Sequence, residues 1–237
     1  MKESIQNYED LLQMLDVLLQ ENTQFHWNDF YSDRKKKIPF FVSSPDENLV
    51  SYLEKGFFDS GHVLELGCGP GRNAIYFAEQ SFTVDAIDSS QKAISWGQER
   101  ASERNVQVNF IQKNIFDFNY AKESYDLIYD SGCFHHIAPH RRMNYLQLLH
   151  MALKPNGYFA LTCFIEGGEL GGAAITDWDV YRLRSLQGGL GFSEEKLRQI
   201  FKDFEMVEIR KMKEIEQPHH HFGVSSLWAA LFRKGNS

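Results

Sequence analysis

A glycine-rich loop with acidic residues on either side is the strongest chemical motif in this sequence. The segment Glu65-Leu66-Gly67-Cys68-Gly69-Pro70-Gly71 follows a short apolar run, and Asp88 stands twenty-one positions after Gly67. Glycines allow a tight turn and a close approach of the backbone to a ligand. A carboxylate at Asp88 can accept hydrogen bonds from both hydroxyls of a ribose. The combination predicts a site for a ribose-containing ligand, and a plain glycine turn is the less favoured alternative.

A second group of polar side chains lies near the middle of the chain. Asp130 ends an apolar run, and Ser131-Gly132-Cys133-Phe134 leads from it to His135 and His136. An imidazole titrates near neutral pH, which suits removal of a proton from a thiol, a phenol or an ammonium group. Adjacent loop residues point in different directions, so at most one histidine is expected to be catalytic. His135 is the first choice and Asp130 the runner-up, while structural roles for both histidines and a packing role for Cys133 are the alternatives.

Alternating apolar and amphipathic segments indicate how these residues are positioned. Strands are expected at 62–66, 82–88, 106–111, 125–130 and 158–164, with helices at 72–80, 89–104 and 141–153 and a turn at 155–157. This alternation predicts an α/β fold with parallel strands and crossover helices. Because an open parallel sheet binds ligands outside the carboxyl ends of its strands, the glycine loop, Asp88 and Asp130 are expected to meet there.

The two ends of the chain extend this core. Helices are expected at 8–20 and 48–55 near the N-terminus and at 193–202 near the C-terminus, followed by strands at 204–212 and 224–232. A short connection between these two strands predicts an antiparallel hairpin at the sheet edge. The glycine-rich segment 166–191 is too long for a plain connection and is expected to be an irregular lid, with an exposed loop as the alternative. Six N-terminal aromatic residues form either the opposite wall of the site or a packing surface for the first helix: Phe25, Trp27, Phe30, Tyr31, Phe40 and Phe41.

The segment VLELGCGPGRNA, which contains the glycine loop, resembles the first motif of the class I (Rossmann-like) S-adenosylmethionine-dependent methyltransferases. The resemblance extends over residues 61–164. A dinucleotide-binding fingerprint would be G-x-G-x-x-G, whereas here Gly71 comes one place early and Arg72 occupies the expected position. The carboxylate of Glu65 would repel a pyrophosphate, but it suits a sulfonium cofactor that carries an ammonium group.

The resemblance implies a seven-stranded, mostly parallel sheet with helices on both faces and an antiparallel last strand. It implies an S-adenosylmethionine-binding domain at 59–237 with a lid insertion around 166–191, preceded by a helical cover at 1–58. Either Asn114 or Asp117 is expected to face the adenine, and a helix cap is the other role for Asp117. The implied cofactor-binding residues are Glu65, Gly67, Cys68, Gly69, Gly71, Asp88, Ser89, Asn114, Ile115 and Asp130.

The loop after the fourth strand restricts the methyl acceptor. Enzymes of the family that methylate amino groups of DNA bases or of glutamine commonly carry an N-P-P-aromatic segment there, and cytosine C5 enzymes carry a Pro-Cys pair. Asp130-Ser131-Gly132-Cys133 matches neither pattern. The sequence therefore favours a small-molecule acceptor at oxygen, nitrogen or sulfur, with a general likeness to thiopurine, thiol and tellurite-detoxifying methyltransferases. A non-catalytic cofactor-binding protein and a nicotinamide-dependent oxidoreductase are the alternatives.

Composition bears on partners and compartment. The formal net charge is -7, and Lys35-Lys36-Lys37 is the only compact basic run, so no nucleic-acid partner is expected. No apolar stretch reaches the roughly 18 residues of a membrane span, and the first residues lack the apolar core of a signal peptide, so no membrane partner and a cytoplasmic location are expected. The three separated cysteines and the run His219-His220-His221 do not indicate a metal site. The run is expected to be structural, with substrate contact as the alternative.

Overall fold

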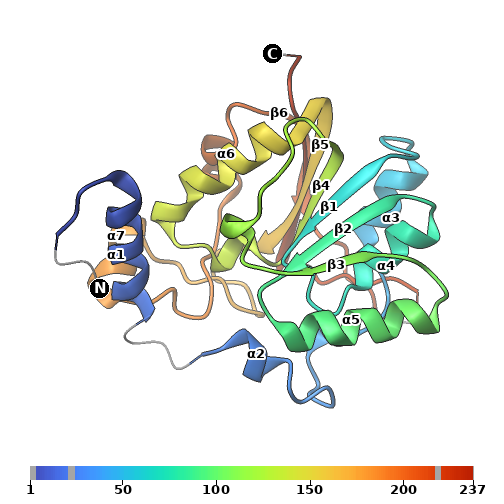
Figure 1. The fold of residues 1–237 in the computed structure, drawn as a ribbon, viewed down its shortest axis with the longest axis horizontal. Helices are drawn as coiled ribbons and strands as arrows, with labels where there is room; N and C mark the ends of the chain where they lie inside the picture. Colours follow the sequence, from blue (N-terminus) through green and yellow to red (C-terminus); the bar gives the residue numbers. More distant parts are fainter. Residues whose placement is uncertain (1–3, 21–24, 217–219, 237) are drawn as a thin grey trace.

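A seven-stranded sheet forms the centre of the molecule in the computed structural model, which describes residues 4–20, 25–216 and 220–236 (Figure 1). The strand order is β3-β2-β1-β4-β5-β7-β6. The first five strands are parallel, and β7 runs antiparallel to both of its neighbours, which confirms the expected fold class. The strands are β1 (His62–Leu66), β2 (Thr83–Asp88), β3 (Asn109–Gln112), β4 (Tyr125–Ser131), β5 (Leu153–Phe164), β6 (Glu205–Lys211) and β7 (Leu227–Arg233).

Helices cover both faces of the sheet because its central strands are apolar on both sides. In β1, Val63 packs into one hydrophobic cluster, while Leu64 and Leu66 pack into another. Such strands, buried on both faces, are characteristic of parallel sheets. The cluster around Val63 is closed by α3 (Glu47–Glu54), α4 (Arg72–Glu79) and α5 (Gln91–Glu103). The opposite cluster is closed by α6 (Arg142–Ala152) and α8 (Glu194–Ile200).

Two of three expectations about the second half of the chain are wrong. The expected turn at 155–157 is present as a tight bend inside β5, which begins at Leu153: Asn156 has a φ of +62°, and the pairing with β4 jumps from Leu153 to Tyr158. The connection between β6 and β7 is not short, because it runs from 212 to 226. The segment 166–191 is not irregular throughout, since it contains α7 (Asp177–Leu183). Thr176 and Asp179 form a reciprocal capping box at the start of that helix, and this pattern was available in the sequence.

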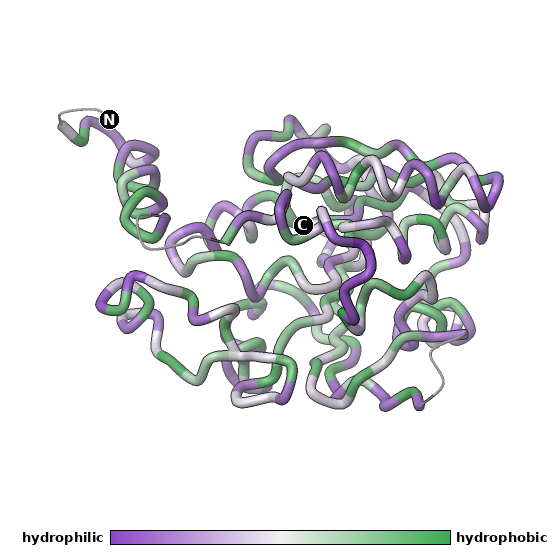
Figure 2. Tube along the Cα trace, turned by 90° about the horizontal axis from the view of Figure 1, so that it is seen from below, coloured by the Kyte–Doolittle hydropathy of each residue, from purple (hydrophilic) through white to green (hydrophobic). Residues whose placement is uncertain are grey.

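Two N-terminal helices lie outside the core sheet. Helix α1 (Tyr8–Gln20) projects from one end of the molecule, and α2 (Trp27–Phe30) lies near the start of α5 (Figures 1 and 2). Asp16 of α1 accepts hydrogen bonds from Arg141 and pairs with His140 in the short helix η4 (Pro139–Arg141). His140 also bonds the Tyr181 hydroxyl of α7 at 2.9 Å. The segment η4 therefore ties α1 and α7 together.

No helix within the described residues has both the length and the apolar composition that crossing a membrane requires.

Candidate active site

The glycine loop joins β1 to α4 at the carboxyl edge of the sheet. Gly67 and Gly69 have φ values of +64° and +52°, in the left-handed region that favours glycine. A Cβ atom on Gly67 would lie 2.6 Å from the Cβ of Cys133, so glycine is required there by the close approach of the loop after β4. A Cβ on Gly69 would meet only the Tyr31 hydroxyl, at 2.9 Å. The backbone at Gly69 thus faces the movable tip of a side chain rather than fixed protein.

Asp88 ends β2 beside this loop, as the sequence predicts. Its two carboxylate oxygens accept hydrogen bonds from the backbone N–H groups of Gly69 and Ser90, at 2.9 and 2.8 Å. The side chain is 7% exposed, and burial raises its pKa while these two bonds lower it. An ionised carboxylate offers about four acceptor positions, so two remain for hydroxyl groups of a ligand. The same residue holds the loop and presents acceptors to the edge of the sheet.

Glu65 is a buried acid with one carboxyl oxygen that lacks a hydrogen-bond partner among the described residues. Burial raises its pKa to about 8, the nearby Asp46 adds to the shift, and Arg72 opposes it. The Ala74 backbone and the Asn73 side chain also lower the pKa of Glu65, and Oε2 is the oxygen without a hydrogen-bond partner in the part of the chain that the structure describes. A buried acceptor without a partner is costly unless a ligand or water satisfies it. A cationic group at the loop would satisfy this oxygen.

Arg72, the first residue of α4, anchors the end of the glycine loop, a role that the sequence analysis missed. Its guanidinium pairs with the fully buried Asp46 at 2.5 Å and donates to the Ser131 hydroxyl and the Ser44 carbonyl. Asp46 also accepts from the Tyr129 hydroxyl at 2.8 Å. A signal existed, because a cation in the first turn of a helix opposes the helix dipole and needs a nearby carboxylate. These contacts join the N-terminal segment, α4 and β4.

The residues after β2 and β3 lie at the far end of the loop. Asn114 caps the short helix η2 (Ile115–Asp117), and its amide oxygen accepts from the Phe116 N–H at 3.0 Å. Asp117 is exposed and is not the cap of this helix, so that alternative is wrong. Ser89 is exposed beside them, whereas Ile115 is buried in the core. The edge here offers one apolar wall with polar groups around it.

Asp130 has a structural environment. It is fully buried, and one oxygen accepts from the backbone N–H groups of Cys133 and Phe134, at 2.9 and 3.2 Å. The other oxygen accepts from the Tyr145 hydroxyl at 2.7 Å. Burial raises the pKa of this carboxyl to about 6. The contacts show Asp130 holding the turn into the helix η3 (Phe134–His136), so its expected contact with cofactor or acceptor stays a prediction.

His135 lies beneath the surface of the site. It is 4% exposed, and its ring stacks on Phe164 with centroids 3.7 Å apart. The Phe164 backbone N–H donates to Nδ1 at 3.3 Å, and burial holds the imidazole pKa well below its usual range. A neutral imidazole has one acceptor nitrogen, so this bond places the proton on Nε2. In this tautomer His135 is a donor and has no free lone pair for a base.

His136 is the more available of the two histidines. It is half-buried, and its ring contacts the edge of Trp27 with centroids 4.8 Å apart. Neither ring nitrogen has a hydrogen-bond partner within the part of the chain that the structure describes. Burial lowers the imidazole pKa to about 4. At neutral pH His136 is therefore uncharged and keeps one lone pair for a ligand.

Helix α2 bridges the two halves of this edge. Asn28 accepts hydrogen bonds from the Ser90 hydroxyl and the Lys92 N–H, both at 3.2 Å, at the start of α5. Trp27 reaches the other side, where it meets His136. Between them Tyr31 is 7% exposed, and burial followed by the charge of Asp88 raises its pKa. The N-terminal aromatic residues thus cover the glycine loop.

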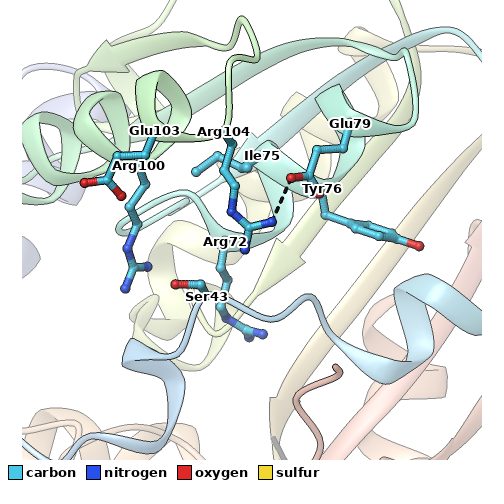
Figure 3. Close-up of a pocket in the computed structure, with 8 residues that line it drawn as sticks. All are labelled: Ser43, Arg72, Ile75, Tyr76, Glu79, Arg100, Glu103 and Arg104. Atoms are coloured by element: carbon cyan, nitrogen blue, oxygen red, sulfur yellow. Dashed lines mark hydrogen bonds and ion pairs between the residues drawn. The ribbon is translucent and has the colours of Figure 1, made fainter. Parts of the chain in front are cut away.

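A small surface pocket lies between α4, α5 and Ser43, and Arg72 is one of its lining residues (Figure 3). Its cationic side chains already have partners: Arg104 pairs with Glu79, and Arg100 donates to the Phe41 carbonyl and lies over the Trp96 ring. The guanidinium groups that line the pocket are thus already engaged by the protein, through an acid at Arg104 and through a carbonyl and a ring at Arg100. The chemistry of the molecule gathers instead at the carboxyl edge of the sheet.

The histidine run is incompletely described. His219 lies outside the described residues, whereas His220 is exposed and His221 is half-buried. Across the ranges that are described, no group of three or more His, Cys, Asp and Glu side chains is placed to hold a metal ion.

Comparison with known proteins agrees with this architecture. Residues 63–157 match a family model described as a methyltransferase domain. An uncharacterized methyltransferase of Schizosaccharomyces pombe is 41% identical over 76 residues, which are 32% of this chain and 52% of that protein. The 2-heptyl-1-hydroxyquinolin-4(1H)-one methyltransferase of Mycobacteroides abscessus is 28% identical over 127 residues, which are 53% of this chain and 56% of that protein. The chain thus spans about half the length of these curated relatives.

A solved structure shares nearly the whole fold. The 1,6-didemethyltoxoflavin-N1-methyltransferase of Burkholderia thailandensis, solved with 1,6-didemethyltoxoflavin and S-adenosylhomocysteine bound, superposes with a TM-score of 0.63. It is 19% identical, and the match covers 99% of this chain and 93% of that one. A likeness at this identity concerns the fold, while the family model concerns the segment from β1 to β5 that builds the site. Together they show that residues 63–157 are similar to methyltransferase domains and that the chain has the fold of this solved methyltransferase.

Proposed function

We propose that this protein transfers a methyl group from S-adenosylmethionine to an oxygen, nitrogen or sulfur atom of a small molecule. The observation that carries the proposal is the unpartnered buried oxygen of Glu65 beside the Gly67–Gly69 loop, with Asp88 at the same edge. A cofactor with a cationic end and a ribose would satisfy both groups. A pyrophosphate would instead be repelled by the Asp88 carboxylate and would bring no cation to Glu65.

The chain's own residues divide the binding of this cofactor between them. Glu65 would neutralise its ammonium group, and the backbone at Gly67 and Gly69 would lie against its methionine part. Asp88 would accept from the ribose hydroxyls, while Ile115, with Asn114 and Ser89, would border the adenine. Cys68 and Gly71 shape the loop, since Cys68 is buried and Gly71 lies against the Phe110 ring. When bound, the cofactor supplies a methyl group already activated on a sulfonium sulfur.

Relatives support a small-molecule acceptor. The Mycobacteroides abscessus relative is named for a hydroxyquinolinone, and the Burkholderia thailandensis structure holds 1,6-didemethyltoxoflavin. The net charge of -7 gives no general attraction for nucleic acid. We therefore propose a small molecule as the partner, and the cytoplasmic location expected from the sequence stays a prediction.

The protein's contribution to methyl transfer is alignment and exclusion of water. Methyl transfer needs no covalent intermediate with the protein, so Cys133 can serve as a packing residue against Gly67. Holding two reactants in line can itself account for much of a rate enhancement. A proton acceptor is required only when the acceptor atom must lose a proton. His136 is the residue whose free nitrogen could serve that purpose.

We also propose that residues 1–58 and the insertion 166–191 cover this site. Helix α2 already lies over the glycine loop, and η4 ties α1 to α7 through Asp16, His140 and Tyr181. A cover on each side would keep water from the reacting groups. Helix α3 has an additional structural role, since Leu49 and Tyr52 are fully buried in the core.

The experiment that tests the function has a binding arm and a product arm. Calorimetry should show S-adenosylmethionine and S-adenosylhomocysteine binding, with NAD binding weaker or absent. Labelled cofactor incubated with thiols, phenols and amines should then give a methylated product. Tighter binding of NAD would contradict the cofactor assignment. Cofactor binding without product from any acceptor would favour a non-catalytic binding protein, the second candidate.

Proton release should accompany cofactor binding, because Glu65 is largely protonated at pH 7. Its pKa is raised from 4.5 to about 8, so the neutral acid predominates below pH 8. Ionising this buried group costs the folded protein stability as the pH rises between these two values. An ammonium group beside it favours the carboxylate. The association constant for S-adenosylhomocysteine should therefore rise with pH, by up to about tenfold per unit between pH 6 and 8, and then level off.

Calorimetry in phosphate and in Tris buffer at pH 7 measures this proton release from the difference in observed enthalpy. The matched control is Glu65→Gln, which keeps the shape of the side chain and cannot titrate. Equal proton release in the wild type and the variant would assign the linkage to another group.

A further inference from the structure

Four aromatic side chains next to the glycine loop form what we call the aromatic slot: Trp27, Tyr31, His136 and Phe164. They come from α2, the segment after it, η3 and the end of β5. Trp27 and Tyr31 are nearly parallel, with centroids 6.1 Å apart, and Phe164 lies 6.1 Å from His136. Three of the four rings are only partly buried. The slot therefore leaves part of three aromatic rings exposed to a molecule that binds against them.

The slot adjoins the place where the cofactor would bind. The Tyr31 hydroxyl lies 2.9 Å from the position of a Cβ on Gly69, and Cys133, directly before η3, packs against Gly67. His136 is the last residue of η3, the short helix that begins directly after Cys133. A molecule held in the slot would thus lie against the loop assigned above to the methionine part of the cofactor.

Charged side chains are missing from the reacting end of the slot among the described residues. The imidazole pKa of His136 is lowered by burial alone, with no contribution from a neighbouring charge. Asp88 and Arg72 act on the neighbouring Tyr31, but Asp88 already accepts from Gly69 and Ser90, and Arg72 is paired with Asp46. A carboxylate or ammonium group in the slot would lose its water without gaining a counter-ion. Burying such an unpaired charge is strongly unfavourable.

Three polar groups in the slot remain available, and one of them is the Tyr31 hydroxyl. The ring nitrogens of His136 and the indole N–H of Trp27 have no hydrogen-bond partner within the ranges that the structure covers. At neutral pH the first offers a lone pair and the second a proton. They can orient one polar edge of a flat molecule whose faces lie against aromatic rings.

We propose, resting on the methyltransferase function above, that the acceptor is a flat aromatic molecule without charged substituents, with its reacting O–H, S–H or N–H group turned to His136. The lone pair of the acceptor atom forms the new bond to the methyl carbon, and the electron pair of the broken bond stays on the cofactor's sulfur. The acceptor's proton passes to the His136 nitrogen and from there to solvent water. The positive charge lost at sulfur thus leaves as a solvated proton, and His136 returns to its neutral form.

The experiment compares acceptors of similar size that differ in charge or in aromatic character. The thiols are 4-methylbenzenethiol, 4-mercaptobenzoate and cyclohexanethiol, and p-cresol with 4-hydroxybenzoate forms the corresponding phenol pair. For the wild type, kcat/KM should be higher by about tenfold or more for the neutral aromatic member of each comparison. Trp27→Ala should reduce this preference about tenfold, and Trp27→Lys should shift it toward the carboxylates.

A binding measurement tests the aromatic slot without relying on turnover. Calorimetry of methyl p-tolyl sulfide with the S-adenosylhomocysteine complex should show binding to the wild type that weakens about tenfold in Trp27→Ala. Tyr76→Ala is the matched control, because Tyr76 lies on α4 at the surface pocket, away from the slot (Figure 3). It should leave both the acceptor preference and the sulfide affinity unchanged.

The outcomes separate this inference from the proposed function. Methylation of charged or non-aromatic acceptors as efficiently as the neutral aromatic ones would overturn the aromatic slot and leave the methyltransferase function intact. An unchanged preference for neutral aromatic acceptors in Trp27→Ala would also overturn the aromatic slot and leave the methyltransferase function intact. If no acceptor of any class is methylated and the sulfide does not bind, the proposed function fails and the inference falls with it.

Discussion

Asp88→Ala should weaken binding of S-adenosylhomocysteine by about 2–3 kcal/mol, which is roughly 30- to 150-fold in Kd. The reason is that a largely buried carboxylate at the end of β2 supplies the acceptors for the ribose hydroxyls. The same carboxylate accepts from the backbone N–H groups of Gly69 and Ser90, so its loss also frees the glycine loop. Calorimetry gives the affinity, and circular dichroism with a melting curve checks that the variant is folded.

The control for this prediction is Asp59→Ala. Asp59 is exposed in the turn before β1, and its only hydrogen bond in the described structure comes from Ser60 at 3.3 Å. Its loss should leave affinity and melting temperature within error of the wild type. An Asp88→Ala protein that folds and binds with undiminished affinity would show that another carboxylate holds the ribose.

His136→Ala should lower turnover at saturating cofactor by about 10²-fold for an acceptor that must lose a proton. His136 has ring nitrogens without a partner in the described structure and lies in contact with Trp27. Because burial lowers its pKa to about 4, the imidazole is neutral above that pH and becomes protonated below it. The acid limb of the kcat/KM profile should therefore fall near pH 4, below the ordinary histidine value, and should disappear in the variant.

His135→Ala should behave differently, although sequence alone ranks it first. Its Nδ1 accepts from the Phe164 N–H, and its ring is stacked on that side chain, so its loss should mainly lower the melting temperature. Asp130→Ala should also destabilise, since Cys133, Phe134 and Tyr145 would lose their acceptor. His150→Ala, on α6 and stacked against Phe204, is the matched histidine control. Full turnover and an unshifted pH profile in His136→Ala would mean that the reaction runs on alignment alone.

The architecture and the cofactor edge were predictable from the sequence because their signals are local. Buried parallel strands appear as short apolar runs, and the loop must be glycine-rich wherever φ is positive, as at Gly67 and Gly69. The position of Asp88 follows from the end of its strand. Errors arose where local signals compete. The glycines around α7 favoured an irregular loop over the helix that forms there with its own capping box.

The sequence by itself therefore determined the α/β sheet, the glycine loop and the acids beside it, because each depends on residues within a few positions of one another. Tertiary structure decided which of these groups are free to act. Asp130 and His135 lie beside the site in the chain, yet the folded core supplies partners to all of their acceptor atoms. Trp27 is more than a hundred residues from His136 and meets it only because α2 crosses the sheet edge. Burial and hydrogen-bond partners depend on contacts between distant segments, and the spacing of residues along the chain does not encode them directly.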